Sequence, residues 1–187
     1  YDSMDHSQVN EVFCNDFFAA RNLTDGVQIL DVGTGTAQIP IAMCKRNSSL
    51  KITAIDLAES MLTLGNKNIQ TALLEDCITL VQVDSKKMHY SDESFDQVIS
   101  NSIIHHIPNP LECFKEMIRV TKKDGLLFVR DLLRPDSIAE LQNIVNLHAG
   151  DATPKQKQLF TDSLHASLSL TEVREMVKLF GFDPFTV

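Results

Sequence analysis

Short runs of β-branched and aliphatic residues alternate with amphipathic segments along most of this 187-residue chain. The apolar runs begin near residues 27, 51, 77, 95 and 126, and apolar positions at helical spacing lie between most of them. This alternation is typical of a doubly wound, Rossmann-like α/β sheet that is mostly parallel and has helices on both faces. The same spacing predicts a further helix over residues 7–21, ahead of the first strand.

The pattern changes after the fifth apolar run. Residues 136–148 again have apolar positions at helical spacing and are predicted to form a helix. The polar stretch 151–163 is interpreted as a loop with some helix. Ser169 and Glu172 have the spacing of a capping box, so a helix is predicted from there to Gly181, a typical C-terminal cap residue. The ending FDPFTV predicts the start of a sixth strand.

Charge and hydropathy restrict the partners. The formal net charge is −8, and no stretch concentrates Lys or Arg. A basic surface supplies most of the affinity for nucleic-acid phosphates, so we expect no nucleic-acid partner. No apolar run is long enough to cross a bilayer, and the first residues have no signal-peptide character, so we expect no membrane partner.

The four cysteines are widely spaced, with no CxxC pair and no metal-ligand spacing. Each lies in an apolar stretch, which is typical of small, reduced core residues. We therefore expect a cytoplasmic protein without a metal site. We expect it to act as a monomer or a homodimer.

The loop after the first strand is the most informative segment. The strand ends at Asp31, the turn contains Gly33 and Gly35, and a helical pattern begins at once. Glycines in such a turn accept unusual backbone dihedrals and let a ligand lie against the main chain. On its own this pattern is equally well explained as a structural turn.

Polar residues at the ends of the next strands change that balance. Asp56 ends the second strand, Asp84 ends the third, and Asn101 comes after the fourth. In a parallel sheet these ends meet at one edge, where an acidic side chain can accept hydrogen bonds from the ribose hydroxyls of an adenosine. Either aspartate alone is more simply a helix cap or a turn residue. Together they predict a nucleoside-binding crevice.

Four segments carry a resemblance to a known family: DVGTGTAQIPIAM, AIDLAESML, VQVDSKKMHY and SFDQVISNSIIHHIPNPLECFKEMIRVTKKDGLLFVRD. In this order they resemble the motifs of small-molecule class I S-adenosylmethionine-dependent methyltransferases, over about residues 27–131. The resemblance implies S-adenosylmethionine as cofactor and S-adenosylhomocysteine as product. It implies methionine-side contacts from Asp31, Gly33, Gly35 and Asn101, a ribose contact from Asp56, adenine packing by Leu57 and Met61, and adenine hydrogen bonds near Asp84 and Ser85.

The resemblance also locates candidates for catalysis and acceptor binding. His105 and His106 come after the fourth strand, in the family's usual place beside the transferable methyl group. Histidine is suited to deprotonating an acceptor near neutral pH, and the alternative is that the pair only shapes the loop. Tyr1 is expected to close over the cofactor, or else to be a frayed end. Phe160 and His165 lie where such enzymes vary their acceptor pocket.

Two departures from the family pattern are visible. Ala37 occupies the position of a third glycine, so we expect a slightly tighter loop with binding retained. The family sheet normally ends in a two-strand hairpin, of which one strand is visible before Val187, so we expect that hairpin to be truncated. We expect a single domain over residues 1–187, divided into a helical lid (1–25), a cofactor-binding core (26–131) and a helical, substrate-side part (132–187).

Two alternatives to a methyltransferase are a dehydrogenase and a cofactor-binding partner module without catalysis. A dehydrogenase fingerprint would place glycine at position 38, where this chain has Gln38. A partner module would keep the same aspartates and differ only in turnover. After the fourth strand, Asn101 is followed by Ser-Ile-Ile rather than the proline-rich motif of nucleic-acid amino-methylating enzymes. This favours a small organic acceptor, with a protein acceptor second.

Overall fold

The computed structural model describes residues 7–21 and 26–187. The chain divides into two compact units. The sheet unit contains the described residues up to Asn101 together with residues 112–130, and the helical unit contains residues 102–111 and 131–187. Within the described ranges, no helix has the length and apolar character needed to cross a membrane. The prediction of a single domain over residues 1–187 stays a prediction.

The sheet unit is built on one parallel sheet with strand order β3-β2-β1-β4-β5. Its strands are β1 (Gln28–Val32), β2 (Lys51–Asp56), β3 (Ile78–Gln82), β4 (Phe95–Asn101) and β5 (Thr121–Arg130). The strand order reverses between β1 and β4, and ligands of open α/β sheets bind at such a switch point. The five predicted strands and the doubly wound fold are therefore confirmed.

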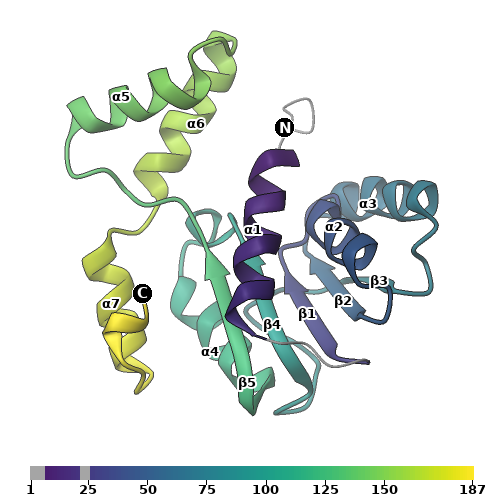
Figure 1. Ribbon diagram of the computed structural model, residues 1–187. Coiled ribbons are helices and arrows are strands. Elements are labelled where there is room, and N and C mark those ends of the chain that lie inside the picture. Colours follow the sequence, from purple (N-terminus) through teal and green to yellow (C-terminus); the bar gives the residue numbers. More distant parts are fainter. Residues whose placement is uncertain (1–6, 22–25) are drawn as a thin grey trace. The chain divides into compact units, whose positions relative to one another are not determined.

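Helices cover both faces of this sheet (Figure 1). They are α1 (Ser7–Ala20), α2 (Gln38–Arg46), α3 (Glu59–Ala72) and α4 (Pro110–Val120). The first three share one apolar core, into which α1 buries Phe13 and Phe17 completely. Ile29 of β1 joins this core, whereas the adjacent Leu30 is buried on the opposite side because strand side chains alternate. On α4, one helical face is buried against the sheet's other side.

The helical unit contains three α-helices and two short 3₁₀ turns. They are η1 (Ile104–His106), α5 (Ile138–Ala149), α6 (Pro154–Ala166), α7 (Leu170–Leu179) and η2 (Pro184–Thr186). The polar stretch predicted as a loop with some helix is helical from Pro154, because Thr153 and Gln156 form a capping box. The predicted capping box of Ser169 and Glu172 is present on α7.

The predicted sixth strand is wrong. Residues 184–186 form η2, in which Asp183 accepts a hydrogen bond from the backbone N–H of Phe185 at 2.9 Å. The aspartate side chain thus supplies a local partner that favours a turn over an extended strand. Pro184 strengthens the same preference, since it has no N–H to give to a strand ladder.

Candidate functional site

The glycine loop after β1 is tied to the end of β2. The backbone N–H groups of Gly33 and Thr34 both donate to the carbonyl oxygen of Ile55 at 2.9 Å. Gly33 and Gly35 have φ values of 77° and 55°, in the left-handed region that glycine adopts at low cost. Apart from the two chain neighbours of Gly35, no atom of the described residues lies within 4 Å of the point where its Cβ would stand. The loop therefore has an open side at Gly35.

Ala37, in place of a third glycine, also has a left-handed backbone. Its φ is 63°, and it is the N-cap residue of α2 with no side-chain cap hydrogen bond. Its methyl group is fully buried beside α3 at Gly65, where an added Cβ would stand 3.5 Å from the Ala37 Cβ and 3.4 Å from Leu80. A methyl group at position 65 would therefore be in ordinary van der Waals contact with that of Ala37.

Asp56 positions the loop as well as facing the candidate site. Its Oδ2 accepts from the Gly35 N–H and its Oδ1 from the Ala58 N–H, both at 2.9 Å. Each carboxylate oxygen has a second lone pair, so these contacts leave acceptors for ribose hydroxyls. Sequence reasoning anticipated a ligand role for Asp56 and missed its role in the loop. The contact with Gly35 joins residues 21 positions apart, so no local pattern indicates it.

Asp31 is almost fully buried at the end of the central strand β1, with 2% of its surface exposed. The pKa of its carboxyl group is raised to about 7, mainly because the group is buried; the neighbouring Thr34 hydroxyl opposes this rise and the negative charge of Asp56 contributes to it. In residues 7–21 and 26–187, no Lys, Arg or His forms an ion pair with Asp31. A cationic ligand group would therefore favour the ionised form at neutral pH.

The other predicted cofactor residues lie at or just beyond the ends of β2, β3 and β4. The end of β3 is joined to β2 because the Val83 N–H donates to the Asp56 carbonyl oxygen at 3.1 Å. Asp84 is half-buried and accepts from the Lys86 N–H at 2.9 Å. Leu57 is 60% exposed, an apolar side chain that a flat ligand can cover. Met61, Ser85 and Asn101 are half-buried.

The two candidate catalytic histidines lie in the helical unit and differ in environment. The His105 ring is buried, and its Nδ1 lies 2.5 Å from Oδ1 of Asp131. Its Nε2 is buried without a hydrogen-bond partner among the described residues. His106 is exposed, and its ring centroid lies 4.0 Å from that of His105. Partial burial and the neighbouring His105 lower the pKa of His106, which Asp131 opposes.

Asp131 was missed by sequence reasoning, which took it only as the end of the fifth strand. Its carboxylate also accepts from the backbone N–H groups of Ile104 at 2.5 Å and Leu132 at 2.6 Å. The signal was present in the predicted topology. The residues just beyond the carboxyl ends of two adjacent parallel strands lie close together, and β4 and β5 are paired up to Asn101 and Arg130.

The predicted acceptor residues are not gathered in one place by the described structure. Phe160 packs against the α5 and α6 core formed by Leu141, Val145 and Leu164. His165 is exposed in the last turn of α6, and Tyr1 lies outside the described residues. A role for these residues in acceptor binding stays a prediction.

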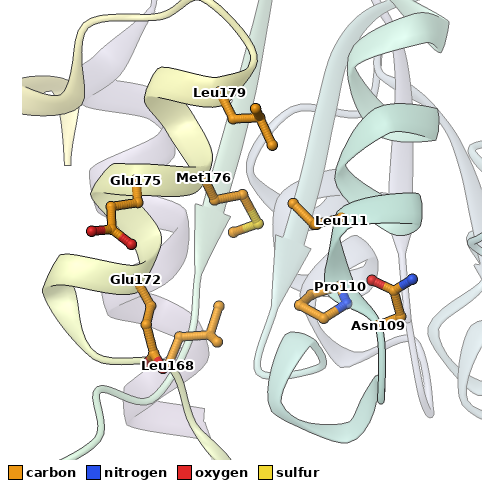
Figure 2. Close-up of a pocket in the computed structure, with 8 residues that line it drawn as sticks. All are labelled: Asn109, Pro110, Leu111, Leu168, Glu172, Glu175, Met176 and Leu179. Carbon is orange, nitrogen blue, oxygen red and sulfur yellow. The ribbon is translucent and has the colours of Figure 1, made fainter.

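Figure 2 shows a separate, largely apolar pocket of the helical unit. Its lining consists of Asn109, Pro110, Leu111, Leu168, Glu172, Glu175, Met176 and Leu179. No residue predicted to bind cofactor or acceptor lies there. Glu172 has partners of its own, because hydrogen bonds from Arg134 and then Ser169 lower its pKa to about 2. In the described part of the chain, no cluster of His, Cys, Asp or Glu is arranged to hold a metal ion.

Comparison with known proteins gives concordant results. A family model described as a methyltransferase domain matches residues 23–179. The demethylmenaquinone methyltransferase of Porphyromonas gingivalis is 29% identical over 145 residues, which are 77% of this chain and 59% of that protein. The enzyme of the same name from Staphylococcus epidermidis is 30% identical over 155 residues, 82% of this chain and 63% of that protein. The chain thus spans about three fifths of the length of these relatives.

A solved structure supports the same fold. The plantazolicin methyltransferase BpumL, in complex with S-adenosylhomocysteine, matches with a TM-score of 0.77 and 20% sequence identity. The match covers 96% of this chain and 66% of that one. At this level of identity the similarity concerns the architecture, and the chemistry must be argued from the residues of this chain.

Proposed function

Because this chain belongs to the methyltransferase-domain family, whose class I members use S-adenosylmethionine, we propose that it transfers a methyl group from that cofactor to a small organic acceptor. The observation that carries this proposal is the buried carboxyl group of Asp31 beside an open glycine loop. S-adenosylmethionine brings an ammonium group, which an isolated buried carboxylate needs as a partner. The pyrophosphate of a dinucleotide would instead place negative charge beside Asp31.

The remaining cofactor contacts come from the carboxyl ends of the strands. The open side of Gly35 leaves room for the ligand, and the second lone pairs of Asp56 accept the ribose hydroxyls. Leu57 and Met61 pack against adenine, where the exposed surface of Leu57 becomes buried. Asp84 and Ser85 lie on the adenine side, and Gly33 and Asn101 lie on the methionine side.

When bound, S-adenosylmethionine supplies a sulfonium-linked methyl group and leaves as S-adenosylhomocysteine. Much of the acceleration of such a displacement comes from holding acceptor and methyl group in line. We assign acid–base assistance to the histidine pair. His105 follows Asn101, a proposed methionine-side residue, by four positions in the chain.

The proposed acceptor is a small organic molecule. Acidic net charge argues for a small molecule rather than nucleic acid, and the two demethylmenaquinone methyltransferases make a quinone-type acceptor the first to test. Tyr1, Phe160 and His165 are proposed to contribute to its binding. We place the reaction in the cytoplasm, carried out by a monomer or homodimer.

The deciding experiment is calorimetric titration of one preparation with S-adenosylmethionine, S-adenosylhomocysteine and NAD. The proposal expects both sulfur nucleosides to bind and NAD to give no heat of binding. Binding of NAD alone would overturn it in favour of a dehydrogenase. Binding of the sulfur nucleosides without turnover across a screen of small acceptors of all classes, with oxygen, nitrogen and carbon nucleophiles, would instead indicate a cofactor-binding partner module.

A further inference from the structure

The carboxylate of Asp131 is oriented independently of the histidine that it holds. Backbone N–H groups of Ile104 and Leu132 donate to its two oxygens at 2.5 and 2.6 Å, and that of His105 adds a longer contact at 3.3 Å. The side chain therefore has one defined direction before the imidazole is considered. Its Oδ1 then lies 2.5 Å from the His105 Nδ1, within strong hydrogen-bond distance.

This contact determines which ring nitrogen of His105 carries hydrogen. A carboxylate only accepts hydrogen bonds, so Nδ1 must be the N–H donor. In the neutral ring, Nε2 is then the nitrogen with the lone pair. That Nε2 is buried and has no partner among residues 7–21 and 26–187. A buried acceptor without a partner is costly, and a functional role is a recognised reason for retaining one.

His106 lacks this arrangement. His106 is exposed, its ring plane is tilted by 45° to that of His105, and no carboxylate in the described residues forms an ion pair with it. Because His106 is exposed and has no such carboxylate partner, its ring orientation is not set in the way that Asp131 sets that of His105.

We propose that His105 Nε2 is the base that deprotonates the acceptor, that Asp131 is its positioning residue, and that the acceptor presents a weakly acidic, phenol-like hydroxyl group. This inference rests on the proposed methyl transfer. An amine with a free lone pair needs no base before attack, so a positioned base has its use when the nucleophile carries a proton. A phenol, with a pKa near 10, is within reach of imidazole, whereas an aliphatic alcohol is far less acidic.

The step conserves atoms and charge. The hydroxyl proton moves to Nε2 while the oxygen bonds to the methyl carbon. The bond between methyl and sulfur breaks, and its electron pair stays on sulfur. The imidazolium that forms is stabilised by the negative charge of Asp131 and then loses its proton to water.

The first test needs no acceptor. Proton–nitrogen NMR of the imidazole groups, assigned with His105→Gln, is expected to show hydrogen on Nδ1 of His105 in the parent protein. In Asp131→Ala the Nδ1 hydrogen of His105 loses its acceptor, so the hydrogen is expected to move toward Nε2, the nitrogen that carries it in a free histidine side chain. Asp151→Ala, at an exposed aspartate of the same unit, is the matched control and should leave the spectrum unchanged. Hydrogen on Nε2 in the parent protein, or an unchanged tautomer in Asp131→Ala, would overturn the assignment.

The second test compares naphthol and naphthylamine as acceptors, since they share one ring system. Transfer to naphthol is expected, with kcat at least about a hundredfold lower in Asp131→Asn and the affinity for S-adenosylmethionine unchanged. Preference for the amine, or transfer to neither acceptor, would overturn the acceptor class. If the parent protein binds S-adenosylmethionine and Asp131→Asn keeps the full rate, the contact between Asp131 and His105 is only structural. That result would overturn the role of Asp131 and leave the proposed function standing. Absence of binding in the parent protein would overturn the proposed function itself.

Discussion

The backbone N–H of Gly35 donates to Oδ2 of Asp56 at 2.9 Å, so the acid that ends β2 holds the glycine loop that comes after β1. Two elements of the candidate cofactor site are thereby joined directly, without a ligand between them. Preorganisation of this kind lowers the ordering cost of binding. The same contact means that a substitution at Asp56 affects both the ligand and the loop.

Asp56→Ala is expected to weaken binding of S-adenosylmethionine by about 1–3 kcal/mol, since hydrogen bonds to a charged group are lost. It should also lower the melting temperature, because the Gly35 and Ala58 N–H groups lose their acceptor. Calorimetry and thermal unfolding measure the two effects. Glu75→Ala, an exposed acid of the same unit, is the control. Unchanged affinity would contradict the ribose assignment.

Asp31→Asn is expected to separate stability from binding. The pKa of Asp31 is about 7 in the folded protein, against an ordinary value of 3.8, so the folded state favours the protonated carboxyl group. This group costs no stability below about pH 4, where it is protonated in both the folded and the unfolded state. It destabilises the fold increasingly as the pH rises to 7. The variant should therefore unfold at a higher temperature than wild type above pH 7, and the difference should vanish at low pH. Thermal unfolding as a function of pH tests this.

Binding should show the opposite preference. In wild type, affinity for S-adenosylmethionine should increase as pH rises toward 7, because the ionised Asp31 pairs with the ligand ammonium group. In Asp31→Asn the affinity should be lower and nearly independent of pH over this range. Calorimetry from about pH 5 to about pH 7.5 measures both. A wild-type affinity that is flat with pH would argue against contact between Asp31 and the ammonium group.

Ala37 and Gly65 are expected to be energetically coupled. Ala37→Gly relieves a left-handed backbone strain of about 1–2 kcal/mol. It also removes a buried methyl group worth about 0.8 kcal/mol and increases the conformational entropy of the unfolded chain, so the net change in stability should be small. Gly65→Ala gains helix propensity and adds a methyl group at ordinary van der Waals distance from the Ala37 methyl group. The double variant loses that contact, so it should be less stable than the single effects predict, by about 0.5 kcal/mol in denaturant unfolding. Strict additivity would show that the two methyl groups do not interact.

Loss of the α7 cap should destabilise the helical unit locally. Ser169→Ala removes the acceptor for the Glu172 N–H and should cost about 1 kcal/mol. Hydrogen exchange of the first turn of α7 is the suitable measurement, because the sheet unit should be unaffected. Ser169→Asp, which can still cap the helix, should restore the protection. Equal loss of protection in both variants would rule out capping as the cause.

Local pattern was sufficient for most of the elements. Alternating apolar runs predicted all five strands, and the Ser169 cap predicted where α7 begins, because both signals depend on neighbours within a few residues. The ending FDPFTV misled for the same reason. Its apolar residues resemble a strand, but whether a strand forms depends on a pairing partner, and the Asp183 turn prevailed.

By itself, then, the sequence determined the fold class and the positions at the end of each strand: Asp31 and the glycine loop after β1, Asp56 after β2, Asp84 after β3 and the histidines after β4. Only the tertiary structure decided which of these groups meet. Asp131 reaches His105 because β4 and β5 pair as far as Asn101 and Arg130, and the methyl group of Ala37 comes to lie beside Gly65 of α3. Burial depends on contacts between distant segments, and so do the pKa of Asp31 and the tautomer of His105. A linear pattern records which residues are present, but it does not record their distances across the fold.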